Sequence, residues 1–237
     1  MVTQIKQTLQ YYYRYSFKPV GMFWLIYFFF LTLMLVLSLH DDIALSITGA
    51  TSFPSMIFII FFSLLTFKNV FPFVIKLGVS RKAYMLSTYI YGLLLSLFMV
   101  VLNYIYLYFF NLLVNVFSIE GFDYIGLNMG EFADILTGNA YLFDLLVHLS
   151  LFLLFTLIGG FFYRFGMIYG VILIAIFPLS MLIKSVGTKI IELLSYLAIF
   201  HENYTPLSFL IIILSCLIVN WLIVHRSSTV DQITKQH

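Results

Sequence analysis

Six stretches of the chain are almost continuously apolar, and the polar residues gather between them. The stretches are residues 20–39, 52–67, 85–117, 141–163, 165–183 and 206–224. A helix needs about 20 apolar residues to cross a bilayer core of about 30 Å. None of the stretches alternates apolar and polar residues with period two, as the strands of a membrane barrel do. The pattern therefore predicts an all-α integral membrane protein with six transmembrane helices, the second of which is short unless residues 43–50 extend it.

The composition supports this interpretation and excludes several classes of protein. Of the 237 residues, 62% are apolar and 9% are charged, whereas an ordinary soluble domain carries about 25% charged residues. We therefore expect residues 1–237 to form one transmembrane domain in contact with the lipid bilayer. The net charge of +2 offers no clustered basic face for a nucleic acid. The single cysteine, Cys216, has no second cysteine in the chain for a disulfide.

The basic residues predict which segments face the cytoplasm, because cytoplasmic loops are enriched in Lys and Arg. With both termini inside, ten of the twelve basic residues lie on the cytoplasmic side. These ten are Lys6, Arg14, Lys18, Lys68, Lys76, Arg81, Lys82, Arg164, Arg226 and Lys235. Only Lys184 and Lys189 then lie outside, and Asp231 is the only acidic residue inside. We predict a multi-pass protein with both termini in the cytoplasm.

Residues 1–18 are expected to form an amphipathic helix that lies along the inner leaflet, outside the first span. The segment mixes basic residues with five aromatic ones, and aromatic rings suit the headgroup layer. Pro19 would then form the corner into the membrane. The alternative is a basic leader that only orients the first span.

Residues 68–84 form the second segment that this topology places in the cytoplasm. Gly78 can end a short helix in the left-handed conformation, and Ser80 can cap the start of the third span. The pattern predicts a short helix across the membrane surface with four cations and an apolar face. The alternative is a positively charged loop that only holds the topology.

The residues Leu77-Gly78-Val79-Ser80-Arg81-Lys82, followed by Tyr84 and the start of a span, resemble a known loop. It joins spans two and three in the permease subunits of the type-2 class of bacterial ATP-binding-cassette (ABC) transporters. The layout of the whole chain is also similar to that family. The resemblance implies that this loop is a coupling helix, which docks into a separate ATPase subunit. The implied coupling residues are Phe71, Val74, Lys76, Leu77, Gly78, Val79, Ser80, Arg81 and Lys82.

The resemblance also gives a role to residues 184–205, where polar residues interrupt the apolar pattern before the last span. Similar exporters have short extracellular helices here, which close an outer gate. The implied gate residues are Ile190, Ile191, Leu194 and Leu197. The alternative is an amphipathic linker on the membrane surface. Residues 118–140, rich in glycine and acids, are expected to form a flexible, solvated extracellular loop.

Two groups of polar residues lie inside the predicted spans. The first is a stripe on the third span, within an arc of about 140° on an ideal helix, and such stripes face protein or a water-filled cavity. Its candidates for a translocation path are Ser96, Asn103, Tyr104 and Asn111. The second group is Asp144 and His148, four residues apart on one helix face. Two ligands are too few for zinc, so a hydrogen bond at the outer edge is favoured over a proton-responsive pair.

The chain contains no phosphate-binding G-x-x-x-x-G-K-[ST] sequence, no H-E-x-x-H and no G-x-S-x-G. We therefore expect no cofactor on this chain, with ATP and Mg²⁺ held by the partner ATPase. The predicted function is the permease subunit of an ABC exporter in a bacterial cell membrane. It would pair with a second, identical or paralogous permease and move hydrophobic or amphipathic cargo, such as a peptide toxin or antimicrobial peptide, by alternating access. An intramembrane enzyme and a membrane scaffold remain as alternatives.

Overall fold

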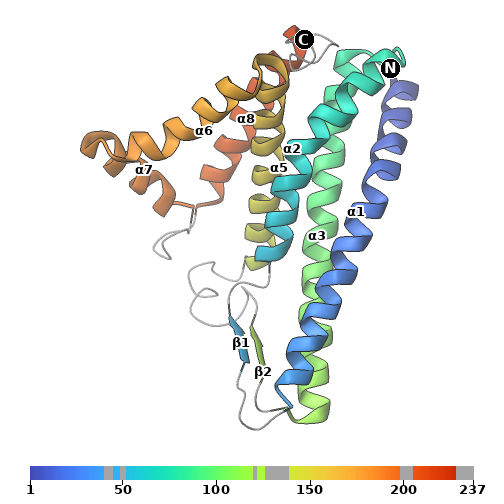
Figure 1. Ribbon diagram of the computed structural model, residues 1–237, viewed down its shortest axis with the longest axis vertical. Coiled ribbons are helices and arrows are strands. Elements are labelled where there is room, and N and C mark those ends of the chain that lie inside the picture. Colours follow the sequence, from blue (N-terminus) through green and yellow to red (C-terminus); the bar gives the residue numbers. More distant parts are fainter. Residues whose placement is uncertain (40–44, 49–51, 120–121, 126–138, 198–204, 228–237) are drawn as a thin grey trace.

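The computed structural model describes residues 1–39, 45–48, 52–119, 122–125, 139–197 and 205–227, and these residues are mostly helical (Figure 1). The helices are α1 Val2–Leu37, α2 Phe53–Lys76, α3 Arg81–Phe117, α5 Ala140–Phe165, α6 Met167–Met181, α7 Lys184–Ser195 and α8 Pro206–Arg226. The strands are β1 Leu45–Thr48 and β2 Phe122–Ile125.

Five helices, α1, α2, α3, α5 and α8, are long and apolar enough to cross a membrane. The chain therefore fits an all-α, multi-pass membrane protein. The predicted fifth span corresponds to α6, which has 15 residues and reaches only about 22 Å at 1.5 Å per residue. It would complete a sixth span only together with α7, and the two helices are bent by 97° at their junction. The six-span layout stays a prediction.

The spanning helices form two groups that pack against each other. Helices α2, α5 and α8 lie together, while α1 runs beside α3 (Figure 1). With 36 and 37 residues, α1 and α3 are each about 55 Å long and extend beyond the others at the end opposite the chain termini. The two strands lie beside this extension (Figure 1).

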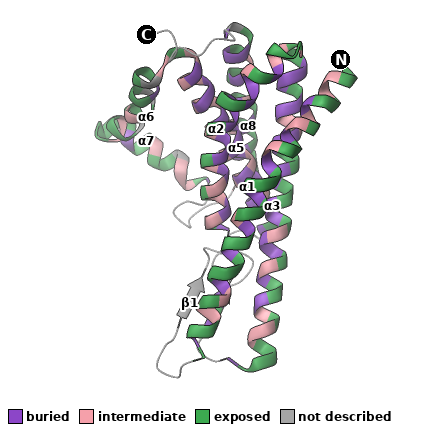
Figure 2. Ribbon diagram, turned by 45° about the vertical axis from the view of Figure 1, so that its right-hand side comes forward, coloured by how far each residue is buried: buried purple, intermediate pink, exposed green. Residues whose placement is uncertain are grey.

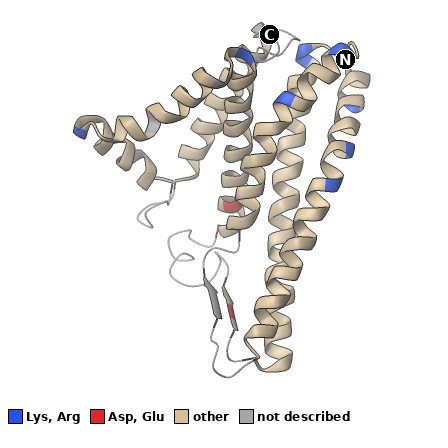
Figure 3. Ribbon diagram, in the orientation of Figure 1, with Lys and Arg blue, Asp and Glu red and all other residues tan. Residues whose placement is uncertain are grey.

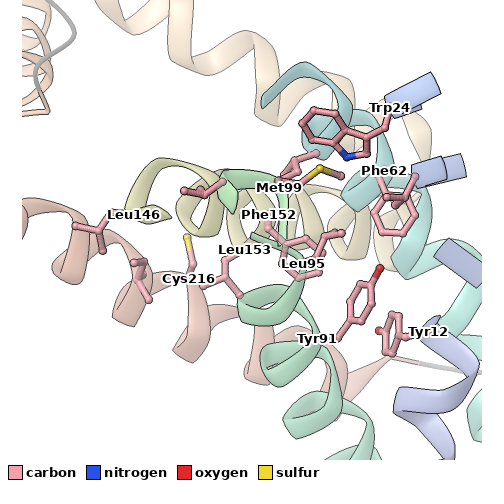
Figure 4. Close-up of a cluster of buried hydrophobic side chains, with 14 of the residues drawn as sticks. Tyr12, Trp24, Phe62, Tyr91, Leu95, Met99, Leu146, Phe152, Leu153 and Cys216 are labelled. Carbon is pink, nitrogen blue, oxygen red and sulfur yellow. The ribbon is translucent and has the colours of Figure 1, made fainter. Parts of the chain in front are cut away.

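Aromatic rings pack both within and between the two groups of helices. Tyr12 of α1 stacks on Tyr91 of α3 with ring centroids 4.5 Å apart (Figure 4). Phe152 of α5 is fully buried and lies so close to α3 that a Cβ at Gly92 would come within 2.4 Å of its ring. Only glycine at position 92 permits this approach. Cys216 of α8 is buried in the same apolar cluster (Figure 4).

The predicted corner at Pro19 is wrong, because α1 continues through this residue as one helix. Proline removes one backbone hydrogen bond from a helix, but packing can compensate for that loss. A single buried stripe runs along α1 on both sides of Pro19. Its members are Thr8, Tyr12, Ser16, Val20, Trp24, Tyr27 and Leu31, three or four residues apart. The stripe is buried on both sides of Pro19, mainly against α3, so residues 1–18 continue the helix of the first span rather than form a separate helix.

The two strands are a departure from the expected all-helical layout. β1 and β2 pair in parallel, with Leu45 opposite Phe122. Phe122 and Tyr124 are buried, whereas Asp123 between them is exposed, so β2 has the alternation of a half-buried strand. The expectation of a solvated loop is therefore wrong for residues 122–125, and residues 126–138 lie outside the described part. Residues 45–48 likewise form β1 rather than an extension of the second span.

Helices α6 and α7 leave the bundle beside α5 and α8 and are largely exposed (Figure 2). Gly166 and Gly170 have the small-xxx-small spacing of close helix packing, but only Gly170 makes such a contact, since no atom lies near the missing Cβ of Gly166. A Cβ at Gly170 would lie 2.1 Å from the ring of Phe162 on α5. This glycine therefore lets the start of α6 pack closely against the end of α5.

Candidate functional site

The α2–α3 turn, residues 76–82, lies at the same end of the molecule as both termini. Lys and Arg gather at this end (Figure 3). The amide of Val79 donates to the carbonyl of Val74 at 3.1 Å and that of Gly78 to Ile75 at 3.0 Å. This pair of hydrogen bonds is the Schellman motif that ends a helix. Gly78 has φ +85°, the left-handed conformation that its sequence context predicted.

Ser80 caps the start of α3, which confirms its predicted role. Its Oγ accepts a hydrogen bond from the amide of Ala83 at 3.3 Å. A contact that the sequence did not indicate comes from Gln4 of α1. Gln4 donates through Nε2 to the carbonyl of Gly78 at 3.3 Å and accepts through Oε1 from Ser80 at 3.0 Å. The side chain of Gln4 thus ties the start of α1 to the turn.

Arg81 joins the turn to the end of α8. Its guanidinium donates to the backbone carbonyls of His225 and, at 2.7 Å, of Ser227. These are carbonyls at a helix C-terminus, which carry partial negative charge and favour a cation. Two of the five N–H donors of Arg81 are therefore used within the chain, and its contact with a partner stays a prediction.

Residues 68–76 do not form the separate surface helix that the sequence predicted, because α2 continues through Pro72 to Lys76. The buried stripe of α2 runs on without a break into this segment. It includes Phe71 and Val74, which are 0% and 2% exposed. Both side chains belong to the core, and Val74 also lines a groove beside α1, so their contact with a partner stays a prediction.

The exposed part of the turn is smaller than the sequence predicted. Leu77 is 69% exposed. Lys76, Gly78, Ser80 and Lys82 are also exposed, whereas Val79 is half-buried. A groove of about 440 Å³ adjoins Leu77. It lies between α1 and the end of α2, and its lining includes Gln7, Tyr11, Arg14, Val74, Leu77 and Val79.

A second group of polar residues, the buried polar cluster, joins α2, α3 and α5 at the opposite end of α2. It consists of Ser52, Ser55, Asn103, Asp144 and His148, all of which are buried. Ser52 Oγ donates to Asp144 Oδ2 at 2.8 Å, and Asn103 Nδ2 donates to Ser55 Oγ at 2.8 Å. Ser55 Oγ lies 2.8 Å from His148 Nε2 and 2.8 Å from the carbonyl of Ser52. Three helices are thereby connected through side chains.

Asp144 and His148 form the centre of this cluster. His148 Nδ1 lies 2.8 Å from the carbonyl oxygen of Asp144 and 3.1 Å from its Oδ1. The better-directed hydrogen bond goes to the carbonyl, so the carboxylate contact is mainly electrostatic. Both residues are 0% exposed. The expected hydrogen bond of the pair is present, and both residues are enclosed by protein.

The residues of the polar stripe on α3 are mostly buried, but they do not all bond to other helices. Ser96, Asn103 and Tyr104 are buried, which confirms that this side of the helix faces protein, and Asn111 is half-buried. Only Asn103 joins the buried polar cluster. Ser55, its partner on α2, and Ser52, which precedes α2, had no signal in the sequence beyond their position at a helix start.

The predicted gate residues lie on α7 or directly after it, away from both polar groups (Figure 1). Ile191 is 51% exposed, Ile190 and Leu194 are half-buried, and Leu197 is buried. Residues 184–195 form one helix, and residues 198–204 lie outside the described part. Their role in a gate stays a prediction.

In the described part of the chain, no three His, Cys, Asp or Glu side chains gather closely enough to hold a metal ion. No protein-family model, curated protein or solved structure matches this chain. The class of protein therefore rests on the fold, which is that of a helical, multi-pass membrane protein with one polar region in its core and one at the end with the termini.

Proposed function

We propose that this chain is the membrane-spanning permease subunit of an ATP-driven ABC exporter. It would lie in a bacterial cell membrane with both termini in the cytoplasm and pair with a second permease. A separate ATPase subunit would bind ATP and Mg²⁺. Closure of the motor would press on the α2–α3 turn and rearrange the spans, so that a cavity for hydrophobic or amphipathic cargo opens alternately to each side.

The observation that carries this proposal is the way the α2–α3 turn is tied to four helices. The turn joins α2 to α3 directly, Gln4 connects it to α1, and Arg81 connects it to α8. A force applied at the turn would therefore reach several spans together rather than a free loop. The accumulation of Lys and Arg at this end (Figure 3) supports a cytoplasmic location by the positive-inside rule.

The exposed Leu77 is the proposed anchor for the motor subunit. Burying a leucine side chain fully contributes about 1.5–3 kcal/mol, whereas exposed ion pairs contribute only about 0–1 kcal/mol each. Lys76 and Lys82 would thus adjust the rate and specificity of docking, and Leu77 would supply more of the affinity. The adjoining groove gives the motor a surface on α1 as well.

The experiment purifies the tagged chain from its native membrane, identifies a bound P-loop ATPase by mass spectrometry and measures ATP hydrolysis in vesicles. Leu77→Asp should reduce the recovered ATPase about tenfold or more, as loss of a buried apolar contact implies. Thr3→Asp, which places the same charge on another exposed residue at this end, should leave recovery unchanged. Equal recovery with both variants would contradict the proposed docking site.

One observation favours a second candidate, an intramembrane hydrolase. Ser55, His148 and Asp144 are connected in the order of a Ser–His–Asp relay, with 2.8 Å between Ser55 Oγ and His148 Nε2. Their burial argues against it, because a substrate needs access to the serine hydroxyl. Labelling of Ser55 by a fluorophosphonate, absent in Ser55→Ala, would favour the hydrolase over the permease.

A further inference from the structure

We propose that the buried polar cluster is a proton-binding site, in which the Asp144–His148 pair takes up and releases one proton while enclosed between α2, α3 and α5. This inference concerns a different site from the α2–α3 turn and does not depend on the proposed permease function. It rests on how the hydrogen bonds of the cluster can be completed and on where its charges lie.

The cluster can satisfy every hydrogen bond around the imidazole with or without an added proton. When His148 is neutral, its Nδ1–H donates to the carbonyl of Asp144, and Nε2 accepts the hydroxyl proton of Ser55. When His148 is protonated, Nε2–H donates to Ser55 Oγ, and the Ser55 hydroxyl turns to the carbonyl of Ser52, 2.8 Å away. In both states Asn103 donates to the remaining lone pair of Ser55.

The direction of the Ser55 hydroxyl group is therefore what changes between the two protonation states. Rotating one hydroxyl is a small movement, and it leaves no buried donor or acceptor on His148 without a partner. A purely structural histidine needs only one such arrangement. Two complete arrangements around one imidazole are what a site that exchanges a proton requires.

The charges around the pair favour occupancy by a proton. On α2 the groups facing the pair are the hydroxyls of Ser52 and Ser55, and on α3 they are the amide of Asn103 and the phenol of Tyr104, which interacts with the charge of Asp144. These groups are uncharged at neutral pH. Burying a carboxylate is unfavourable unless it is paired, so a proton on His148 offsets the charge of Asp144.

The proton would also link the charge of the cluster to the packing of the helices. Ser52 at the start of α2 donates to Asp144 on α5, and a carboxylate at a helix N-terminus is stabilised by the helix dipole. Loss of the proton leaves a net negative charge between α2 and α5. We therefore expect deprotonation to loosen the contact between these two helices.

The experiment follows the histidine ring nitrogens by NMR in lipid nanodiscs from pH 5 to pH 9. Replacing three of the five histidines, as His40→Gln, His201→Gln and His237→Gln, leaves two: His148, which is buried, and His225, which is exposed. His225 serves as the internal control, and its signals are assigned by adding His225→Gln.

We expect His148 to change between the neutral and protonated signal patterns within this pH range, in a protein that stays folded. Asp144→Asn removes the opposite charge and should lower the proton affinity of His148 about tenfold or more, while His225 keeps its titration. A His148 that holds one protonation state from pH 5 to pH 9 while His225 titrates would overturn the proposal. So would an unchanged His148 titration in Asp144→Asn. If Asp144→Asn does not fold, Ser55→Ala supplies the second test, because it should alter the tautomer signals of His148.

Discussion

Two serines at helix starts show how the two polar regions differ. Ser80 precedes α3, and its hydroxyl accepts a hydrogen bond from the helix that it begins. Ser52 precedes α2, but its hydroxyl makes no bond to its own helix and donates to Asp144 on α5 instead. The first serine is exposed and both caps its own helix and bonds Gln4 of α1, whereas the second is buried and its hydroxyl bonds only another helix. At the α2–α3 turn the polar groups fix helix ends and connect them at the surface, and in the buried polar cluster they connect helices inside the core.

The largest effect is expected from removing the charge at the centre of the buried polar cluster. Asp144→Ala leaves the hydroxyl of Ser52 without its acceptor and removes the carboxylate beside His148, whose Nδ1 keeps the backbone carbonyl of residue 144. It should lower the free energy of unfolding by about 3–5 kcal/mol. Ser150→Ala is the matched control, since Ser150 is buried on the same helix and its hydroxyl has no hydrogen-bond partner in the structure. Denaturation of the purified protein in detergent measures both. Equal stabilities of the two variants would show that the cluster does not hold the helices together.

The two serines allow the comparison itself to be tested. Ser52→Ala leaves a buried carboxylate oxygen without its donor, and we expect a loss of about 1–3 kcal/mol. Ser80→Ala removes an exposed helix cap and should cost about 1 kcal/mol. Hydrogen exchange would separate the two effects. Exchange should increase in both α2 and α5 for Ser52→Ala, and only in the first turns of α3 and α1 for Ser80→Ala, because Ser80 bonds Ala83 and Gln4.

Replacing two glycines by alanine should change the stability by smaller amounts and with opposite signs. Gly78 has φ +85° with no atom near its missing Cβ, so Gly78→Ala should destabilise the protein by about 1–2 kcal/mol through backbone strain alone. Gly21 lies inside α1 and is equally uncrowded, so Gly21→Ala should stabilise it by about 0.5–1 kcal/mol. Thermal unfolding of the two variants measures the difference. A loss of stability in Gly21→Ala would contradict the continuous α1.

The sequence predicted the helices of the membrane domain well because long apolar runs have few alternatives in lipid. It failed where tertiary packing decides the boundaries. Pro19 and Pro72 were read as a corner and as part of a separate segment, yet buried stripes carry α1 and α2 through both residues. The strand pair was missed because each strand has only four residues and pairs with a segment far away in the chain.

For the candidate sites, local signals were reliable and long-range contacts were not. Gly78 and Ser80 could be predicted because helix ends depend on neighbouring residues. Gln4, which reaches the turn from α1, and the use of Arg81 by α8 depend on how helices pack, and no sequence spacing encodes this. Asp144 and His148 were found as a pair from their spacing. Their burial depends on Ser52, Ser55 and Asn103, which come from two other helices.

The measurement that tests the central claim most directly is site-specific cross-linking from the α2–α3 turn. Leu77→Cys in a Cys216→Ser background has one reactive thiol, because Cys216 is the only cysteine in the chain. A thiol-directed cross-linker applied to the native membrane should join this residue to a P-loop ATPase, identified by mass spectrometry, and ATP should change the yield. Thr3→Cys in the same background should give a much lower yield. Cross-links to lipid or to other proteins only, with no ATPase at either position, would contradict the proposal that this turn receives a motor subunit.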